Sequence, residues 1–242
     1  MDIIKSMIVW FSGIVILAVL FPLTFIIWLV VLPFDKERMV IHWMLIGQGI
    51  ILSRLMPIWK ISIEGREKAV KGTTYVMISN HQSILDTILL TCLRYRFKWI
   101  SKIENLKVPV LGWYLGMAGY IIVDRDNEKS KETMLADSYN CLKKGISLMI
   151  FPEGTRSRDN QIGVFKRGAF ELAIKANVPI LPILIDGTGG VLPKHGVVFS
   201  SGHHLKIKVL DPVQPDSFDT ENPYDLAIKI QALMRSEQER LN

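Results

Sequence analysis

The sequence predicts a mixed α/β domain built on a single sheet, preceded by an N-terminal helical segment that anchors the chain in a membrane. From residue 60 onward, short apolar runs alternate with amphipathic stretches, as they do in α/β proteins. Residues 7–34 carry no charged side chain, which is typical of a helix in contact with lipid. The mean hydropathy of +0.27 is high for a water-soluble enzyme. We therefore expect a membrane-anchoring segment over residues 1–59 and one α/β domain over residues 60–242.

The apolar run from Met7 to Phe34 is the predicted membrane anchor. It exceeds the roughly 20 apolar residues that a membrane-spanning helix needs. A signal peptide fits less well, because its apolar core is usually about 7–15 residues and no small-residue cleavage site follows. Pro22 removes one backbone hydrogen bond and is expected to kink the helix. A tilted span and a bent helix within one leaflet both fit, and the flanking charges do not settle the orientation.

A second apolar segment, from Val40 to Trp59, is interrupted by polar residues and fits a helix lying at the membrane interface beside the first. Three tryptophans fit either the headgroup level of a bilayer or the protein core: Trp28, Trp43 and Trp59.

Short apolar runs in the α/β domain are predicted as strands: Ile61–Glu64, Tyr75–Ser79, Lys98–Ser101, Tyr120–Val123, Ser147–Phe151, Ile180–Ile185 and Leu205–Val209. Stretches with helical spacing of apolar residues are predicted as helices: Ile84–Arg94, Val110–Met117, Lys129–Lys143, Phe165–Ala176 and Pro223–Arg240. The last of these has Asn222 as its N-cap, and its apolar face is expected to hold Leu226, Ile230 and Leu233.

The net charge and the cysteine content indicate the compartment of the protein and its binding partners. The net charge of +6 suits an anionic membrane surface or an acidic ligand, although it also fits simple solubility. Cys92 and Cys141 have no metal-ligand spacing, which indicates a reducing compartment without disulfides. We expect no nucleic-acid partner. We also expect no metal, because the histidines at the C-terminal end have no cysteine or carboxylate partners at ligand spacing: His195, His203 and His204.

The first candidate site is His81 with Asp86, directly after a predicted strand. On one continuous helix these residues would be rotated apart by roughly 140° and could not meet. If His81 lies in the loop and Asp86 in the first helical turn, the carboxylate can orient the imidazole, as in a Ser-His-Asp triad. A substrate hydroxyl would then replace the serine. An ordinary N-capping turn, with Asp86 favoured by the helix dipole, is the alternative.

The second candidate site is the charged turn Phe151–Arg158, which also follows an apolar strand. Glu153, Arg156 and Arg158 beside Gly154 could bind a polyhydroxy phosphate, because guanidinium groups bind phosphate oxygens and a carboxylate accepts from hydroxyls. A solvated charged loop is the alternative.

Two further segments give only a weak indication of a functional site when each is taken alone. Gly119–Arg125 is a predicted strand that ends in an exposed arginine, and Val178–Ile183 is a predicted strand with two prolines. Pro182 within a strand indicates an edge or a bulge. The glycine-rich stretch Gly187–Gly190 fits no phosphate-binding pattern and is expected to be a turn.

The order of these four segments resembles the 1-acylglycerol-3-phosphate acyltransferase family. The chain shows Asn-His-x4-Asp, Gly-x4-Asp-Arg, Phe-Pro-Glu-Gly-Thr-Arg and Val-Pro-Ile-Leu-Pro-Ile in order between Asn80 and Ile183. The resemblance implies a glycerolipid-acyltransferase-like fold. It also implies transfer of a fatty acyl group from acyl-carrier protein or coenzyme A to the sn-2 hydroxyl of lysophosphatidate, giving phosphatidate, in a membrane. For a bacterial chain, this would be the inner membrane with the site facing the cytoplasm.

The resemblance also implies roles for individual residues. His81 would be the catalytic base and Asp86 would orient it. The residues implied to bind the phosphate-bearing acceptor are Lys102, Arg125, Glu153, Gly154, Thr155 and Arg156. Backbone N–H groups after Gln82 could stabilise an oxyanion. The basic surface that could meet an acidic carrier protein contains Lys98, Lys107 and Lys166.

No cofactor is expected, because direct transfer needs only a hydroxyl, a base and an oxyanion stabiliser. Another lysolipid could replace lysophosphatidate as acceptor within the same chemistry, such as a lysophosphatidylcholine-type lipid or a lyso-ornithine lipid. An acyl-thioester hydrolase and a catalytically inactive lipid-binding scaffold are the alternatives from other classes. The sequence leaves the acyl-chain length, the donor and the oligomeric state open.

Overall fold

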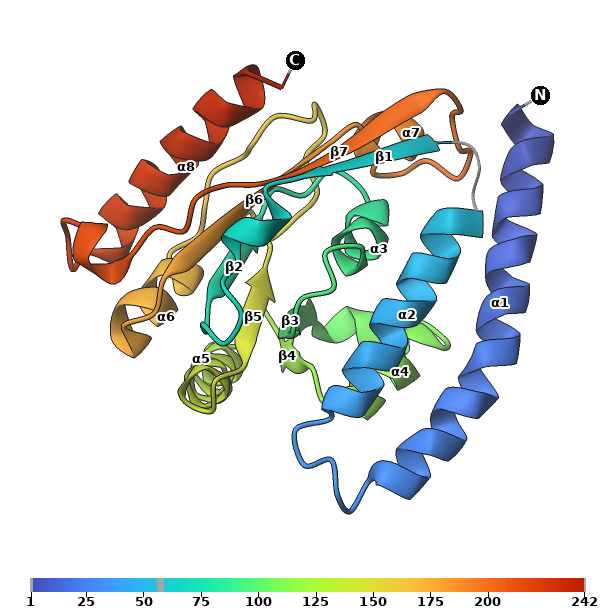
Figure 1. Ribbon diagram of the computed structural model, residues 1–242, viewed down its shortest axis with the longest axis horizontal. Helices are drawn as coiled ribbons and strands as arrows, with labels where there is room; N and C mark the ends of the chain where they lie inside the picture. The colour runs from blue at the N-terminus through green and yellow to red at the C-terminus, as the bar shows by residue number, and fades with distance from the viewer. Residues whose placement is uncertain (1, 56–58, 242) are drawn as a thin grey trace.

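A computed structural model describes residues 2–55 and 59–241, and Figure 1 shows one sheet between two layers of helices. The sheet has 7 strands in the order β1-β7-β6-β2-β5-β3-β4. Their bounds are β1 Trp59–Glu64, β2 Val76–Ser79, β3 Phe97–Lys102, β4 Ile121–Val123, β5 Ser147–Ile150, β6 Ile180–Asp186 and β7 His203–Val209. Within the described residues β6 and β7 pair antiparallel and the other neighbours pair parallel, so the predicted single mixed sheet is confirmed.

The predicted helices are also found, with changed ends. The helices are α1 Asp2–Val31, α2 Met39–Leu55, α3 Leu85–Thr91, α4 Leu111–Met117, α5 Glu128–Lys143, α6 Gly168–Ala176, α7 Thr188–Val191 and α8 Pro223–Glu239. Short 3-10 turns are η1 Arg66–Lys68, η2 Ile103–Lys107 and η3 Pro215–Ser217. Helix α3 stops before the predicted Arg94, whose φ of 55° is incompatible with a right-handed helix.

Alternation along the strands separates the two faces of the sheet. In β2, Met77 points into one core with α2, α3 and α7, whereas Val76 and Ile78 point into the other, which α5, α6 and α8 cover. Helix α8 begins as predicted, with the Asn222 side chain accepting from Tyr224 N at 3.0 Å. Its inner face differs from the prediction, because Leu233 is exposed and Met234 is buried in its place.

The prediction for Gly187–Gly190 was wrong, since this stretch is not a plain turn. Gly187 adopts a φ of 87°, and residues 188–191 then form the single helical turn α7. A side chain at Gly187 would place its Cβ 2.6 Å from the carbonyl oxygen of His204, so glycine is required there. The turn brings Thr188 over the carboxyl end of β2.

Pro182 does not lie on a sheet edge, because β6 is flanked by β7 and β2. The alternative prediction, a bulge, fits the register. Ile183 pairs with Val209 and Ile180 bridges to Val213, so the partner segment holds one extra residue opposite Pro182. The mismatch lets β6 accommodate a residue without an N–H, while the Pro182 carbonyl still accepts from Leu210 N at 2.9 Å.

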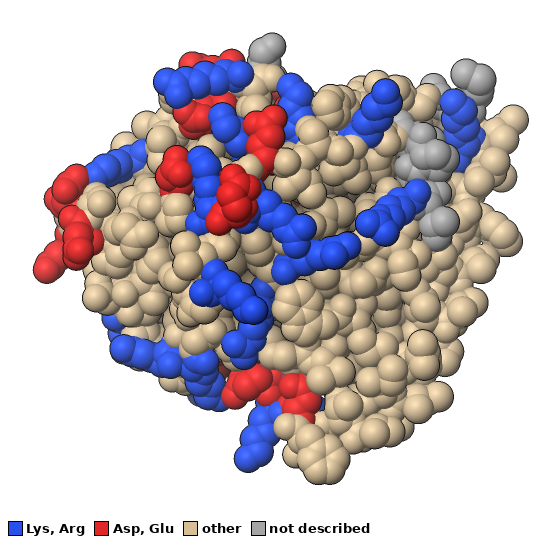
Figure 2. All heavy atoms as spheres, in the orientation of Figure 1, with Lys and Arg blue, Asp and Glu red and all other residues tan. Residues whose placement is uncertain are grey.

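Helix α1 is long and apolar enough to cross a membrane by length and composition, and 6 % of its most apolar window is buried. It continues through Pro22 and lies beside α2 (Figure 1). Figure 2 shows that the side formed by α1 and α2 carries few charged residues. These features support the predicted membrane association.

Helix α2 is held against the α/β domain by its polar residues. The second apolar segment was predicted to lie at an interface because of such residues, but His42 and Gln48 are buried. Tyr120 Oη donates to His42 Nδ1 at 3.0 Å, and His42 Nε2 donates to the carbonyl of Tyr95 at 2.9 Å. The last part of that predicted segment includes residues 56–58, which lie outside the described residues. Trp59, by contrast, is in the core, with 8 % of its surface exposed.

Candidate active site

The loop after β2 places His81 and Asp86 in contact. His81 lies in the loop, and Asp86 lies in the first turn of α3, as the sequence required for a contact between them. The Asn80 side chain fixes the loop by donating to Ile185 O and accepting from Ile185 N, both at 2.8 Å, which extends the pairing of β2 with β6. His81 Nδ1 is 2.7 Å from Asp86 Oδ2.

Asp86 is fully buried and every contact it makes is with a donor. Its Oδ2 also accepts from the backbone N–H groups of Gln82 at 2.7 Å and Ser83 at 2.9 Å. Its Oδ1 accepts from the hydroxyl of Thr188 at 2.5 Å. A carboxylate held by these donors accepts a hydrogen bond from the protonated Nδ1 of His81, which leaves Nε2 of the neutral imidazole as an acceptor. This is the tautomer that a general base requires.

Of the N–H groups after Gln82 that were expected to stabilise an oxyanion, that of Ser83 is already used. It donates to Asp86, as does the N–H of Gln82 itself, so neither points toward a substrate carbonyl. The sequence could not reveal this, because a carboxylate four residues ahead can turn back onto the loop only once the helix start is fixed.

The charged turn after β5 holds the main chain of His81 on both sides. Glu153 Oε1 accepts from His81 N at 2.9 Å, and Ser157 N donates to His81 O at 2.7 Å. Glu153 Oε2 accepts from Gly163 N at 3.1 Å. Burial raises the pKa of Glu153, against the opposing effect of these two N–H donors. Glu153, expected to bind the acceptor, thus uses one oxygen to position the loop that carries His81 and the other to hold Gly163.

An aromatic stack supports the imidazole from one side. The His81 ring lies parallel to Phe151 with centroids 3.9 Å apart, and Phe151 stacks on Trp99 at 5.5 Å. The side chain of His81 is 17 % exposed. The ring is therefore restrained in plane, position and tautomer while part of it stays open to a substrate.

Cationic side chains gather at the same end of the sheet. Arg125 follows β4 and its guanidinium donates to the carbonyl of Gly154. Burial lowers the pKa of Arg125, and the nearby Glu104 opposes this shift. Gly154 has a φ of 70°, and a Cβ there would lie 3.1 Å from the Lys166 side chain. Lys102 lies at the end of β3 and pairs with Glu104 at 2.9 Å.

Arg156 lies beside an open cavity. A hollow of about 390 Å³ is bordered by residues of the turn and by α8: Glu153, Thr155, Arg156, Ser157, Arg158, Asp159, Gln161, Ile162, Gly163, Val164 and Arg235. The guanidinium of Arg156 forms no hydrogen bond or ion pair within residues 2–55 and 59–241. A half-buried cation without a partner at a cavity wall is suited to an anionic ligand.

Two residues near this site carried no signal in the sequence. Thr188 was assigned to a turn, and Lys194 follows it in an irregular loop. Lys194 Nζ donates to Thr155 Oγ1 at 3.0 Å and to the Arg156 carbonyl at 2.8 Å, so it fixes the cationic turn from outside. Thr155 is thereby part of the site wall, with its hydroxyl already bound.

Lys98 does not belong to the surface that could meet a carrier protein. It was expected there with Lys107 and Lys166, which are exposed, but its own exposed fraction is 5 %. Its ammonium group donates to Gly119 O at 2.8 Å, and burial lowers its pKa. Lys98 therefore caps the end of α4 inside the protein.

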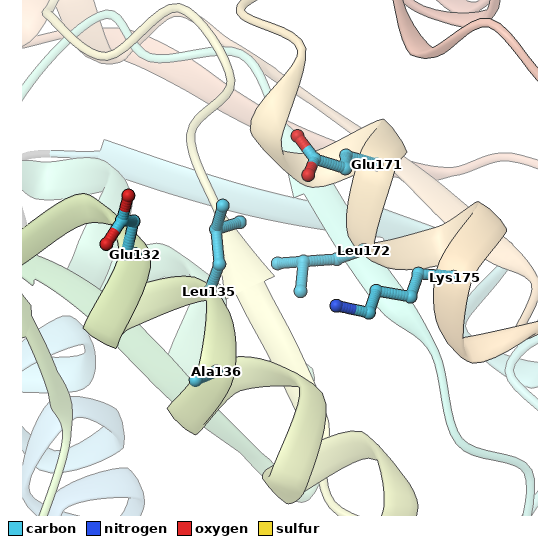
Figure 3. Close-up of a pocket in the computed structure, with 6 residues that line it drawn as sticks. All are labelled: Glu132, Leu135, Ala136, Glu171, Leu172 and Lys175. Carbon is cyan, nitrogen blue, oxygen red and sulfur yellow. The ribbon is translucent and has the colours of Figure 1, made fainter. Parts of the chain in front are cut away.

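A second hollow of about 240 Å³ lies between α5 and α6 (Figure 3). Its lining is Glu132, Leu135, Ala136, Glu171, Leu172 and Lys175, none of which belongs to the loops around His81. Since α5 and α6 cover one face of the sheet and the loops leave its carboxyl edge, this hollow is separate from the site.

Comparison with known proteins relates this geometry to a family. The family described as Acyltransferase matches residues 60–186. A chloroplastic 1-acyl-sn-glycerol-3-phosphate acyltransferase of Arabidopsis thaliana is 36 % identical over 190 residues, which cover 78 % of this chain and 53 % of the relative. A probable 1-acyl-sn-glycerol-3-phosphate acyltransferase of Mycoplasma genitalium is 31 % identical, covering 70 % of each chain.

A solved structure shares the fold. The crystal structure of the 1-acyl-sn-glycerophosphate acyltransferase from Thermotoga maritima superposes with a TM-score of 0.82 at 24 % identity, covering 99 % of this chain and 95 % of that one. The chain spans about half the length of the first curated relatives it matches, at 53 %, 47 % and 49 %.

Proposed function

The chain belongs to the acyltransferase family, and on that basis we propose that it transfers a fatty acyl group from a thioester to the sn-2 hydroxyl of lysophosphatidate, giving phosphatidate. The observation that carries the proposal is the His81–Asp86 pair, 2.7 Å apart, next to a turn rich in cations. The names of the relatives support lysophosphatidate as the acceptor.

The chemistry follows from the free Nε2 of His81. As the acceptor hydroxyl attacks the thioester carbonyl, Nε2 takes the hydroxyl proton and Asp86 stabilises the imidazolium. The new C–O bond forms, the C–S bond then breaks, and the departing thiolate takes the proton from His81. A positioned base contributes about 10²–10⁴-fold to such a rate, and no enzyme nucleophile or cofactor is needed.

The phosphate of the acceptor is proposed to lie between Arg125 and Arg156. Both arginines are half-buried, Arg125 is tied to the turn at Gly154, and Arg156 borders the cavity. Two guanidinium groups can bind a phosphomonoester through several charge-assisted hydrogen bonds. Lys102 is proposed as a weaker contributor, because it already pairs with Glu104.

The donor is proposed to be acyl-carrier protein or acyl-coenzyme A, both of which are acidic. Lys107 and Lys166 are exposed and provide positive charge near the site, which would favour the encounter with either donor. A donor that binds through such exposed charges should bind more weakly as salt rises.

We propose that α1 lies in one leaflet and keeps the site on the cytoplasmic side. A helix that crosses a bilayer as an isolated span has lipid around it, whereas α1 touches the domain at separate points along its length. Trp10 Nε1 donates to Val197 O at 2.8 Å, and the Phe21 ring lies 5.5 Å from that of Tyr114. One side of α1 is therefore covered by protein and the other is free for lipid.

The decisive experiment compares lysophosphatidate with lysophosphatidylcholine, using the detergent-purified protein with acyl-coenzyme A and acyl-carrier protein as donors. We expect preferential transfer to lysophosphatidate and loss of turnover in His81→Ala, with the fold retained by circular dichroism. Near-normal transfer by His81→Ala would overturn the mechanism. Transfer only to the choline lipid would overturn the acceptor, and thioester loss without a lipid product would indicate a hydrolase.

A further inference from the structure

An exposed apolar segment, residues 103–113, connects the end of β3 to α4. It contains η2 and the start of α4, and several of its large apolar side chains face outward: Ile103 39 %, Leu106 41 %, Val108 46 %, Leu111 37 % and Trp113 56 % exposed. Single exposed apolar residues are normal on protein surfaces, but a contiguous group usually marks a contact with lipid or another molecule.

The backbone of residues 103–113 is built to present these side chains. Gly112 packs so closely on η2 that a Cβ would lie 2.1 Å from the carbonyl oxygen of Leu106. Val110 adopts a φ of 66°, a conformation that is costly for a β-branched residue. Gly112 N donates to Val108 O at 2.8 Å and closes the turn. The unfavourable backbone conformation of Val110 and the close packing of Gly112 thus hold this apolar surface in a defined shape.

The segment is continuous with the apolar surface of α1. The Phe21 ring lies 5.2 Å from that of Trp113, so the outer side of α4 joins the outer side of α1. The inner side of α4 is buried against α1 and α2 through Tyr114, Leu115 and Met117. The more exposed side of α4 therefore borders the exposed apolar surface of α1.

The segment also adjoins the candidate active site. It begins immediately after Lys102, which pairs in the sheet with Val123, two residues before Arg125. Lys107 is an exposed cation within the segment and has no ion pair in the part of the chain that the structure describes. Glu104, the one carboxylate in the segment, is paired with Lys102 at 2.9 Å, which leaves Lys107 as the free cation at its margin. An apolar surface with such a cation complements lipid chains below anionic headgroups.

We propose that residues 103–113 form a second membrane-inserting element, which enters the same leaflet as α1 and holds the acceptor side of the active site at the lipid surface. Phospholipid acyl chains are the occupant of this surface. The membrane-contacting surface then extends beyond the N-terminal helices into the α/β domain. Insertion is measured without turnover and does not depend on the proposed function. Only the expected effect on activity rests on that function.

The test places a single fluorophore at chosen positions in a Cys92→Ala/Cys141→Ala background. Val108→Cys and Leu111→Cys probe the segment, and Ile14→Cys on α1 is the positive control at 63 % exposure. Ile228→Cys on α8, with 64 % exposure, is the matched negative control. Each protein is labelled with an environment-sensitive dye and mixed with phosphatidylcholine–phosphatidylglycerol vesicles whose acyl chains carry bromine.

We expect the dyes at 108 and 111 to shift to shorter wavelength and to be quenched as strongly as the dye at 14, while the dye at 228 stays unquenched. Quenching at 14 without quenching at 108 and 111 would overturn the proposal. So would equal quenching at 228, which would indicate unspecific adsorption. Occupation of this surface by a second copy or a carrier protein would appear as protection of 108 and 111 that depends on protein concentration or on added carrier, without bromine quenching, and would also overturn it.

The consequence for activity is tested separately with Leu106→Asn/Leu111→Asn. We expect kcat/KM for a long-chain lysolipid in vesicles to fall roughly tenfold, because two apolar side chains no longer enter the bilayer. The kcat/KM for a short-chain, monomeric acceptor should remain at the wild-type level, as should both values in Ile228→Asn. An equal loss on both acceptors would contradict an effect through the membrane. If the chain transfers no acyl group at all, the quenching result still decides insertion.

Discussion

The hydroxyl of Thr188 donates to Oδ1 of Asp86 at 2.5 Å across 102 residues of sequence, and both side chains are fully buried. The bond completes the set of donors around the carboxylate that orients His81. It comes from α7, a single helical turn that exists because Gly187 reverses the chain after β6. The orientation of the candidate base is therefore fixed by two loops, one after β2 and one after β6.

Thr188→Val should lower kcat by about 10–100-fold with little change in KM, since a hydrogen bond to a charged group contributes about 1.5–3 kcal/mol. Thr188→Ser keeps the hydroxyl and should restore kcat. Steady-state kinetics of both variants provide the measurement, and a wild-type kcat in Thr188→Val would show that the bond has no role in positioning.

Arg156→Ala should raise the KM for lysophosphatidate by about 10–100-fold, because a charge-assisted contact with the phosphate is lost. The KM for the acyl donor should stay near the wild-type value. Arg96→Ala, which removes an exposed arginine outside the site, serves as the control for general charge effects. Steady-state kinetics with each substrate varied in turn provide the measurement. An unchanged acceptor KM would remove Arg156 from the phosphate site.

Glu153→Gln should lower both stability and kcat. The amide can accept from only one of the N–H groups of His81 and Gly163, and leaving the other buried donor unsatisfied costs about 1–3 kcal/mol. Thermal unfolding and turnover are measured together, with the half-exposed Glu171→Gln on α6 as the control. A variant with normal stability and rate would mean that Glu153 does not position the His81 loop.

The buried side chain of His42 should make the protein less stable in acid. Burial lowers the pKa of His42 to about 4 from an ordinary 6.5, so between these values the unfolded chain binds more protons than the folded one. Stability should therefore fall as pH falls through that window, by at most roughly 3 kcal/mol from this group. His42→Gln can keep the bond to Tyr95 and should flatten this dependence. Denaturation at pH 7 and pH 4.5 in detergent measures it, and an equally steep loss in the variant would assign the effect elsewhere.

The strands were predictable because their signal is local. Each predicted strand is present and begins and ends within two residues of the expected position, from Ile61 in β1 to Val209 in β7. The contact between His81 and Asp86 was also predictable, since only a loop-to-helix placement brings a His-x4-Asp pair together.

The features that the sequence did not reveal depend on contacts between distant segments. Thr188 acquires its partner only when β6 lies beside β2, and Lys194 reaches Thr155 from a loop without regular structure. The expectation of an oxyanion donor at Ser83 was wrong for the same reason, because Asp86 turns back to accept from its N–H group. Likewise, Lys98 was expected at the surface, but its burial depends on how α4 ends against β3.

The place of β1 in the sheet has a consequence for biogenesis. This strand follows the two N-terminal helices directly, yet its partner among the described strands is β7, with Trp59 opposite His203 and Glu64 opposite Lys208. During synthesis, the edge of β1 stays unpaired beside the membrane until β7, at residues 203–209, has emerged, and such long-range pairing is slow and prone to aggregation. Premature termination before β7 would thus leave an anchored chain with an unpaired β1, a natural substrate for quality control at the bilayer.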